Sequence, residues 1–198
     1  MESNIWKQEF IEIFSNNIKR EGSEKLLEWL LNTDFFIAPA STKFHNAFEG
    51  GLCEHSINVY KRLLKLWNDE QTNIPELKTH TPESIAICGL LHDLCKTNLY
   101  AVEFRNVKKD GAWIQTPYYT VKDNLPYGHG EKSVYIISGF MRLTRDEAMA
   151  INWHMGGFDS RVKGGDYSLS TAFEMHPLAT LTHIADIEAT YFDEQRGI

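Results

Sequence analysis

Apolar side chains recur every three or four residues along the first third of the chain, which is the spacing of one helical face. The first helix is expected from Ser3 to about Lys19, behind a serine cap, and a short second helix follows Ser23. A third helix should run from Gly50 or Gly51 to about Asn68. Residues 35–48, between the second and third helices, contain turn-forming residues and are expected to be a loop.

The most apolar helix is expected after Thr81. In the run Thr81-Pro82-Glu83, threonine can cap a helix, proline suits its first position and glutamate complements its dipole. The segment SIAICGLLHDLCK that follows is apolar on nearly every side, which indicates a central, buried helix. It ends by delivering His92 and Asp93, two polar side chains that need partners.

The hydrophobic period changes between residues 101 and 121. Strand-forming residues flank Lys109-Asp110-Gly111, and Asp-Gly is a favoured hairpin turn, so we predict a small inserted β-hairpin. It precedes His129 in the chain, and we expect it to lie over a site built around His92 and Asp93. It is either a substrate lid or an ordinary exposed hairpin with cross-strand aromatic pairs.

Helices return after the hairpin. One is expected from about Glu131 to Arg142, and the capping box Thr144-Arg145-Asp146-Glu147 opens another that ends near His154. A polar, glycine-rich loop is expected from Phe158 to Ser170, and a last helix begins around Pro177. The predicted fold class is therefore all-α, a helical bundle with one small β-hairpin.

The composition fits one globular domain over residues 1–198, because 42% of the residues are hydrophobic. No run approaches the roughly 18 apolar residues of a membrane helix and the start lacks a signal-peptide pattern, so we expect a cytoplasmic protein without a membrane partner. Cys53, Cys88 and Cys95 form no Cys-x-x-Cys pair and are expected to be buried thiols. A net charge of −7 does not suit binding to a long nucleic acid.

Five segments each place a histidine or an aspartate at or near a helix end or turn. Imidazole nitrogens mixed with carboxylate oxygens suit Mn, Fe, Ni, Co or Zn better than Mg or Ca, and the lack of paired thiols argues against a structural zinc. We therefore expect a catalytic metal. The candidate ligands are His55, His92, Asp93, His129, His154 and Asp186.

The physical argument is strongest at His92 and Asp93. A carboxylate at the end of an apolar helix is costly to bury unless a cation or a hydrogen-bond network neutralises it. Lys96 follows Asp93 by three residues, on roughly the same helical face, where its ammonium could meet a substrate phosphate. The alternative is a buried hydrogen-bonded pair, and a single histidine on a helix is more often a structural residue than a ligand.

Taken in order, these motifs resemble the HD superfamily, defined by a histidine, a His-Asp doublet and a distal aspartate. The segments PAxxxxHxxxxGGLCEHS, LLHDLCK, GHGEKS, WHMGG and HIADIEA are similar to the catalytic domain of HD-type 3′ to 5′ exoribonucleases of Gram-positive bacteria and to small phage HD proteins. The resemblance covers about residues 38–192. Two helices are predicted where those exoribonucleases carry an OB-type domain, so processive RNA degradation is not expected.

The resemblance implies an HD-domain helical bundle in which His55, His92, Asp93 and Asp186 hold one metal ion. Asp93 would bridge to a second ion held by His129 and His154, which could instead be substrate contacts. Asp93 and Lys96 would be the catalytic residues. The residues expected to contact the substrate are Lys96, His45 and Arg105.

The expected function is that of a metal-dependent phosphohydrolase or phosphodiesterase acting on a nucleotide or short oligonucleotide. The partner would be a small phosphorylated substrate, and a homodimer is left open. One alternative is a non-catalytic sensor that binds a nucleotide through the same fold. Another is a di-iron oxygenase, because some HD proteins with extra histidines use paired irons to activate oxygen.

Overall fold

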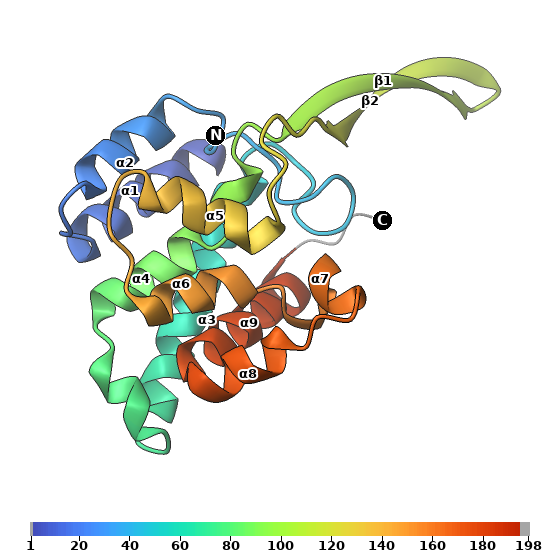
Figure 1. Ribbon diagram of the computed structural model, residues 1–198. Helices are drawn as coiled ribbons and strands as arrows, with labels where there is room; N and C mark the ends of the chain where they lie inside the picture. Colours follow the sequence, from blue (N-terminus) through green and yellow to red (C-terminus); the bar gives the residue numbers. More distant parts are fainter. Residues whose placement is uncertain (1, 195–198) are drawn as a thin grey trace.

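The computed structural model describes residues 2–194 and shows a mostly helical protein with a two-stranded antiparallel sheet (Figure 1). Short 3₁₀ turns connect several helices, at Pro75–Thr79, Leu94–Lys96 and Gly156–Phe158. The α-helices are α1 (Glu2–Asn17), α2 (Ser23–Leu31), α3 (Gly51–Glu70), α4 (Pro82–Leu91), α5 (His129–Ser138), α6 (Arg145–Trp153), α7 (Ser160–Lys163), α8 (Ser168–Met175) and α9 (Pro177–Glu188).

Helix α4 forms the centre of the body, as its apolar sequence predicted. All its residues from Ser84 to Leu91 are buried, and α4 packs against α1, α3 and α6. At Gly89 the helices α3 and α4 approach so closely that a Cβ would lie 2.5 Å from the Cα of Tyr60. Thr81 caps α4 by accepting a hydrogen bond from the Ser84 amide, which confirms the predicted start. The buried helix thus carries His92 and Asp93 into the interior.

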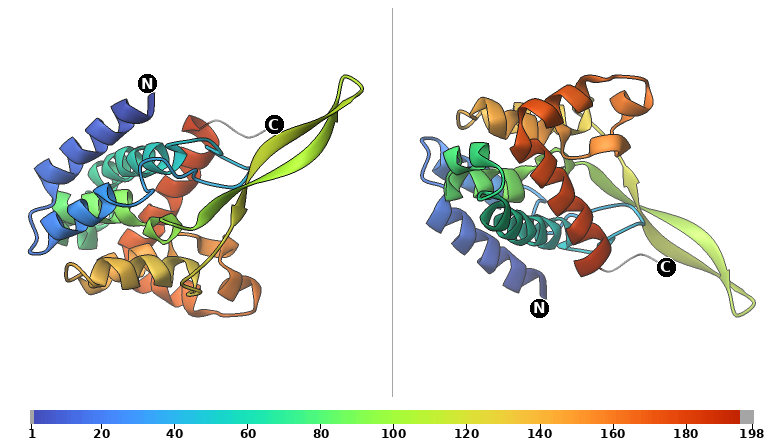
Figure 2. Two further views of the ribbon diagram at one scale, coloured as in Figure 1. Left: turned by 90° about the horizontal axis from the view of Figure 1, so that it is seen from above. Right: turned by 90° about the horizontal axis from the view of Figure 1, so that it is seen from below.

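The predicted hairpin is confirmed, with β1 (Tyr100–Lys109) paired to β2 (Ala112–Val121). Asp110 and Gly111 both have positive φ, as the tight turn requires. The ribbon projects away from the helical body (Figures 1 and 2). One of its faces bears four large, exposed apolar side chains, those of Val102, Phe104, Trp113 and Val121.

Two predicted boundaries in the second half were wrong. Helix α5 ends at Ser138 rather than near Arg142, because the chain turns to bury Met141 and to pack Phe140 against Trp29. The stretch expected to be a loop from 158 to 170 contains α7 and the start of α8. Helix α7 is a single turn capped by the Asp159 side chain, and a single turn is too short to show a helical period.

The last helix, α9, packs against α3 and α6 and continues beyond Glu188 as a short π-helix, Ala189–Asp193. The cysteines are buried free thiols, as predicted. Within residues 2–194 no helix combines the length and apolar character needed to cross a membrane.

Candidate metal centre

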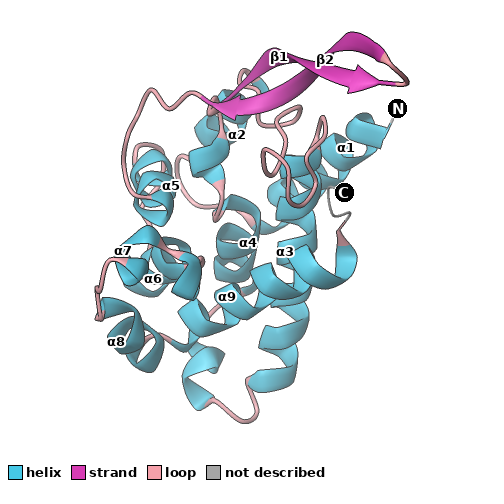
Figure 3. Ribbon diagram, turned by 90° about the vertical axis from the view of Figure 1, so that its right-hand side faces the viewer, coloured by secondary structure: helices cyan, strands magenta, loops and turns pink. Residues whose placement is uncertain are grey.

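The structure brings all six predicted ligands together. His55 lies in the first turns of α3, His92 and Asp93 follow α4, and His129 is the first residue of α5. His154 ends α6, and Asp186 comes from α9. Figure 3 shows α4 in the middle of the body with these helices around it. Residues separated by more than a hundred positions therefore meet at one point.

Asp93 lies between two pairs of histidines. Its Oδ2 atom is 3.4 Å from His55 Nε2 and 3.5 Å from His92 Nε2. Its Oδ1 atom is 2.8 Å from His129 Nε2 and 3.4 Å from His154 Nε2. Each oxygen of one carboxylate thus faces a different pair of imidazoles, an arrangement suited to a carboxylate that bridges two cations.

Hydrogen bonds at Nδ1 direct the Nε2 atoms of three imidazoles at this cluster. The Nδ1 atoms of His92 and His154 donate to the carbonyl oxygens of Gly89 and Ile151, at 2.9 and 2.7 Å. His55 Nδ1 donates to a carboxylate oxygen of Glu194 at 2.7 Å. When such a ring is neutral, its single N–H is on Nδ1 and its Nε2 atom has a lone pair, as in metal-binding histidines. Burial would lower the pKa of His55, but Glu194, Asp186 and Asp93 raise it well above its ordinary value, so a metal ion would replace the proton on its Nε2 atom.

His154 provides the clearest test of whether a cation fits. Burial lowers the pKa of this side chain, so the ring is neutral with its proton on Nδ1. Its buried Nε2 atom has no hydrogen-bond partner, although Asp93 Oδ1 lies 3.4 Å away. A lone pair beside an anion in the interior is unfavourable unless a cation lies between them. The donors therefore fit a bound metal ion.

Asp186 adds a second carboxylate, with its Oδ1 3.3 Å from His55 Nε2. Burial by itself would raise the pKa of Asp186, but the nearby His55 and the other imidazoles hold it well below its usual range. The pKa of Asp93 is also well below its usual range, because Lys96 and the histidines outweigh its burial. Both side chains are therefore carboxylates, as metal ligands must be.

Lys96 contacts the cluster directly, with its Nζ atom 2.6 Å from Asp93 Oδ2. Their spacing placed the two residues on roughly one helical face; in the structure α4 ends at Leu91, and a 3₁₀ turn, Leu94–Lys96, brings them together instead. Asp93 raises the pKa of Lys96 even though burial opposes this, so the side chain carries an ammonium. The cluster thus includes one fixed positive charge beside its central carboxylate.

Sequence reasoning missed Glu194 and Cys95. Glu194 accepts hydrogen bonds from His55 Nδ1 at 2.7 Å and from His45 Nδ1 at 2.6 Å, and its side chain is fully buried. Neighbouring His55 lowers the pKa of Glu194 to about 2 although burial opposes this, so Glu194 is ionised. The Cys95 thiol lies 3.5 Å from His129 Nδ1. Cys95 lies within the LLHDLCK segment but was predicted only to be a buried thiol, and Glu194 lies outside the motifs and follows the last predicted helix.

His183 is close to the cluster without being a predicted ligand. Its Nδ1 atom donates to the backbone oxygen of His154 at 2.7 Å, and its ring lies beside that of Phe173. His183 precedes Asp186 by about one helical turn, a spacing that suits either orienting that carboxylate or packing. The contact to the His154 backbone and to Phe173 favours a packing role.

A cavity of about 500 Å³ adjoins the cluster. Asp93, Lys96, His129 and Asp186 line one part of it, and His45 lies there as well. The remaining wall is mostly apolar, formed by Phe44, Met155, Phe158, Ile187, Thr190 and Tyr191, with Lys163 and His183 also present. Lys96 and His45, two of the three predicted substrate contacts, therefore border this space.

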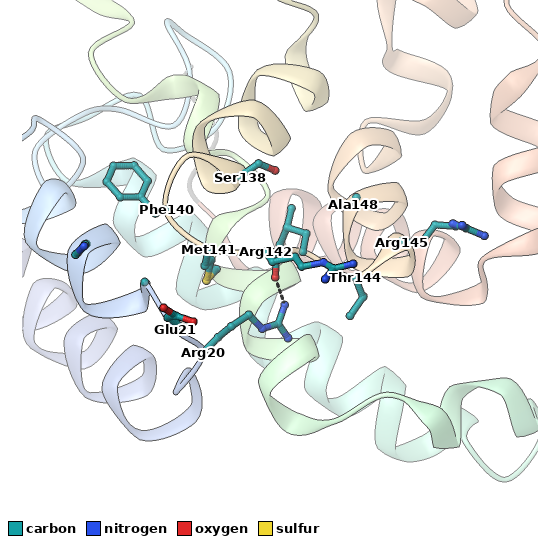
Figure 4. A pocket seen from close by; sticks show the side chains of 12 residues that line it. Arg20, Glu21, Ser138, Phe140, Met141, Arg142, Thr144, Arg145 and Ala148 are labelled. Carbon is teal, nitrogen blue, oxygen red and sulfur yellow. Dashed lines mark hydrogen bonds between the residues drawn. The ribbon is translucent and has the colours of Figure 1, made fainter.

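Arg105, the third predicted substrate contact, lies elsewhere. It is exposed in β1 and lies 5.2 Å from the Tyr118 ring centroid, and no described residue of the hairpin lines the cavity. A larger hollow of about 1100 Å³ lies between α2 and the α5–α6 turn (Figure 4). Its lining, which includes Arg20 and Arg142, contains no histidine or aspartate among the described residues, so it is separate from the candidate metal centre.

The described residues thus form a candidate metal site with two overlapping donor groups. One consists of His55, His92 and Asp93, and the other of Asp93, His129 and His154; within each, the donor atoms lie within 4.8 Å of one another. The donor atoms of His92, His154 and Asp186 also lie within 4.8 Å of one another. We found no match to this chain among protein-family models, curated proteins or solved structures.

Proposed function

We propose that this protein is a metal-dependent phosphohydrolase of the HD type, which cleaves a phosphate ester of a nucleotide or short oligonucleotide. The observation that carries the proposal is the position of Asp93, whose two oxygens face two separate pairs of imidazoles. The order His55, His92-Asp93, Asp186 along the chain matches the HD motif, and the helical fold is compatible with it. A cytoplasmic location remains part of the proposal.

His55, His92, Asp93 and Asp186 would hold one divalent ion of Mn, Fe, Ni, Co or Zn. His129 and His154 would share Asp93 with a second. Such ions lower the pKa of bound water and so supply a nucleophile at neutral pH. Imidazole and carboxylate donors together favour these transition metals over Mg or Ca.

The chain's own residues would position the substrate. The Lys96 ammonium borders the cavity and is close enough to the ligands to stabilise negative charge on a phosphoryl oxygen. His45 borders the same space; burial lowers its pKa and its Nδ1 atom donates to Glu194, so its Nε2 atom would accept a hydrogen bond from a substrate hydroxyl or amide. The apolar wall, with Phe44 and Phe158, suits a planar group such as a nucleobase and excludes water from one side of the ester.

The test combines metal analysis with turnover. Purified protein is analysed for metal per chain and assayed with added Mn on a bis-phosphodiester and a panel of nucleotides. We expect about two metal ions per chain and hydrolysis of at least one ester. Asp93→Ala should lose both metal and activity, while Asp69→Ala, at an exposed position of α3, should keep both.

The outcomes separate the alternatives. One metal ion with activity on monoesters alone would make His129 and His154 substrate contacts. Oxygen uptake by reduced, iron-loaded protein without ester hydrolysis would support the di-iron oxygenase. Neither metal nor turnover after reconstitution would contradict the proposal and favour the non-catalytic sensor.

Lys96→Ala tests the role of the ammonium. We expect turnover to fall on the order of 100-fold, the usual loss for a group that stabilises transition-state charge, with metal content near normal. Elemental analysis and initial rates measured on the same sample check this. Unchanged turnover would show that Lys96 only pairs with Asp93.

A further inference from the structure

The chain changes geometry where it leaves α9. The regular helix ends at Glu188, residues Ala189–Asp193 form a π-helix, and Glu194 takes an extended conformation. π-helical turns are rare and are frequently found at functional sites. Here the wider turn and the extended residue bring the Glu194 side chain back into the interior, where it is fully buried.

Arg62 of α3 holds this segment in place. Its Nε and Nη2 atoms donate to the two oxygens of Asp193, at 2.7 and 2.5 Å. Its Nη1 atom lies 3.5 Å from Glu188, and its guanidinium carbon lies 5.8 Å from the centroid of the Phe192 ring. One arginine therefore contacts the residue before the π-helix and the last two residues of the π-helix. A bidentate pair of this kind specifies orientation as well as adding energy.

Glu194 links two histidines with different roles in the proposed site. Its Oε1 accepts from His55 Nδ1, and the Nε2 atom of that ring faces Asp93 and Asp186. Its Oε2 accepts from His45 Nδ1, and His45 lines the cavity. The two rings pack edge to face, with centroids 4.8 Å apart. One carboxylate thus orients a candidate ligand and a cavity side chain together.

We propose that residues 189–194 form a C-terminal latch, in which Glu194 is a positioning residue for His55 and His45. The latch rests on the proposed metal centre: by holding the proton of His55 on Nδ1, Glu194 keeps the Nε2 lone pair directed at the metal. Carboxylates that orient a metal-bound histidine in this way typically contribute 10- to 100-fold in metal affinity. Arg62 acts indirectly on His55, because it fixes the segment that carries Glu194.

The first measurement is metal affinity, by competition of Zn or Co with a chromophoric chelator. Glu194→Ala should weaken binding about 10- to 100-fold. Glu194→Gln keeps an oxygen that accepts from His55, so it should recover most of the loss. Arg62→Ala should give a smaller loss than Glu194→Ala. The visible spectrum of the Co-loaded protein should change in Glu194→Ala, because the orientation of one ligand changes.

Two control variants match these changes. Glu174→Ala removes an exposed glutamate from α8, and Lys61→Ala breaks an exposed ion pair with Glu9 beside Arg62. Both should bind metal as the native protein does. The fold of every variant is checked by circular dichroism, and Glu194→Gln keeps the test valid if Glu194→Ala does not fold.

The second measurement separates the latch from the metal centre. In metal-free protein, the hydrogen-bonded Nδ1 proton of His55 should give a downfield NMR resonance that disappears in Glu194→Ala. If the native protein binds no metal but this resonance behaves as expected, the proposed centre is wrong and the latch contact stands. Native affinity and an unchanged resonance in Glu194→Ala would overturn the latch.

Discussion

Asp93 and Glu147 are two carboxylates buried in the same helical body, with exposed side-chain fractions of 2% and 0%. Each lies 2.6 Å from a cationic side chain, Asp93 from Lys96 and Glu147 from Arg20. Their remaining neighbours differ. Glu147 accepts a second hydrogen bond from Arg20, at 2.9 Å, and one from the Thr144 amide at 2.8 Å. Asp93 is surrounded by imidazole rings instead.

The comparison shows how a structural acid differs from a candidate ligand. The Arg20 guanidinium and the Thr144 capping amide can only donate, and the Ser84 hydroxyl also hydrogen-bonds to Glu147, so this carboxylate is satisfied within the protein. Arg20 also donates to the Arg142 carbonyl, at 2.9 Å, which connects the α1–α2 turn to the α5–α6 turn (Figure 4). Around Asp93 the lone pairs of His92 and His154 converge on the carboxylate. Lys96 and His129 also contact this carboxylate, but the buried His154 Nε2 atom has no partner, and a bound cation would satisfy it.

Replacing Asp93 and Glu147 by their amides should distinguish a metal ligand from a structural acid more strongly than any other change. Asp93→Asn should lower turnover by more than about 100-fold, beyond the loss typical of residues that only support a ligand, and should abolish metal retention. Glu147→Gln should retain metal but lower the free energy of unfolding by about 2 kcal/mol, since it weakens charged hydrogen bonds. Metal analysis and urea unfolding check both. The reverse pattern would contradict the assignment of the two acids.

Removing the cation of the structural pair should destabilise the protein. Arg20→Ala leaves Glu147 buried without its main partner, which should cost about 3 kcal/mol in the free energy of unfolding. Lys61→Ala, which breaks the exposed pair with Glu9, should cost no more than about 1 kcal/mol. Chemical denaturation measures both values. An equal effect of the two substitutions would mean that the Arg20–Glu147 pair is not structurally important.

Acid should remove the contribution of Glu147. Burial would raise its pKa, but the hydrogen bonds from Arg20 outweigh this and lower the pKa below the ordinary value of 4.5. Because the folded pKa is lower than the unfolded one, the contribution is complete above about pH 4.5 and is lost as pH falls through the folded pKa. The difference in unfolding free energy between native protein and Glu147→Gln should therefore stay constant above about pH 4.5 and shrink as the pH falls below that value. If the difference in unfolding free energy did not change with pH, the lowered pKa of Glu147 would be contradicted.

Shortening the hairpin should have the smallest effect on the surroundings of Asp93 and of Glu147. The variant replaces residues 103–118 by Asn-Gly, so that the paired residues Val102 and Tyr119 are joined by a tight turn. Metal content should be native and Tm should change by no more than about 2 °C, because the removed residues are mostly exposed and lie outside the core. The ester that the native protein hydrolyses fastest is then used to test whether the hairpin, which carries Arg105, contributes to substrate binding. A tenfold fall in kcat/KM would support the lid, and unchanged kinetics an ordinary hairpin.

Local signals in the sequence predicted much of the fold. The Thr81 cap, the Thr144 capping box and the Asp-Gly turn each depend on a few neighbouring residues, and all three are present. Helix α7 and the end of α5 were not predicted correctly. Asp159 capping and the burial of Met141 decide them, and neither produces a period in the sequence.

By itself, the sequence determined that the chain is mostly helical, that a hairpin interrupts it, and which histidines and aspartates are candidates for a site. Tertiary structure alone decided that Asp93 faces two pairs of imidazoles, that Arg105 lies away from the cavity, and that Glu194 reaches back to His55. The physical reason is the separation along the sequence over which each effect acts. Capping and periodicity act between residues a few positions apart, whereas the direction of a lone pair depends on helices packed together from distant parts of the chain.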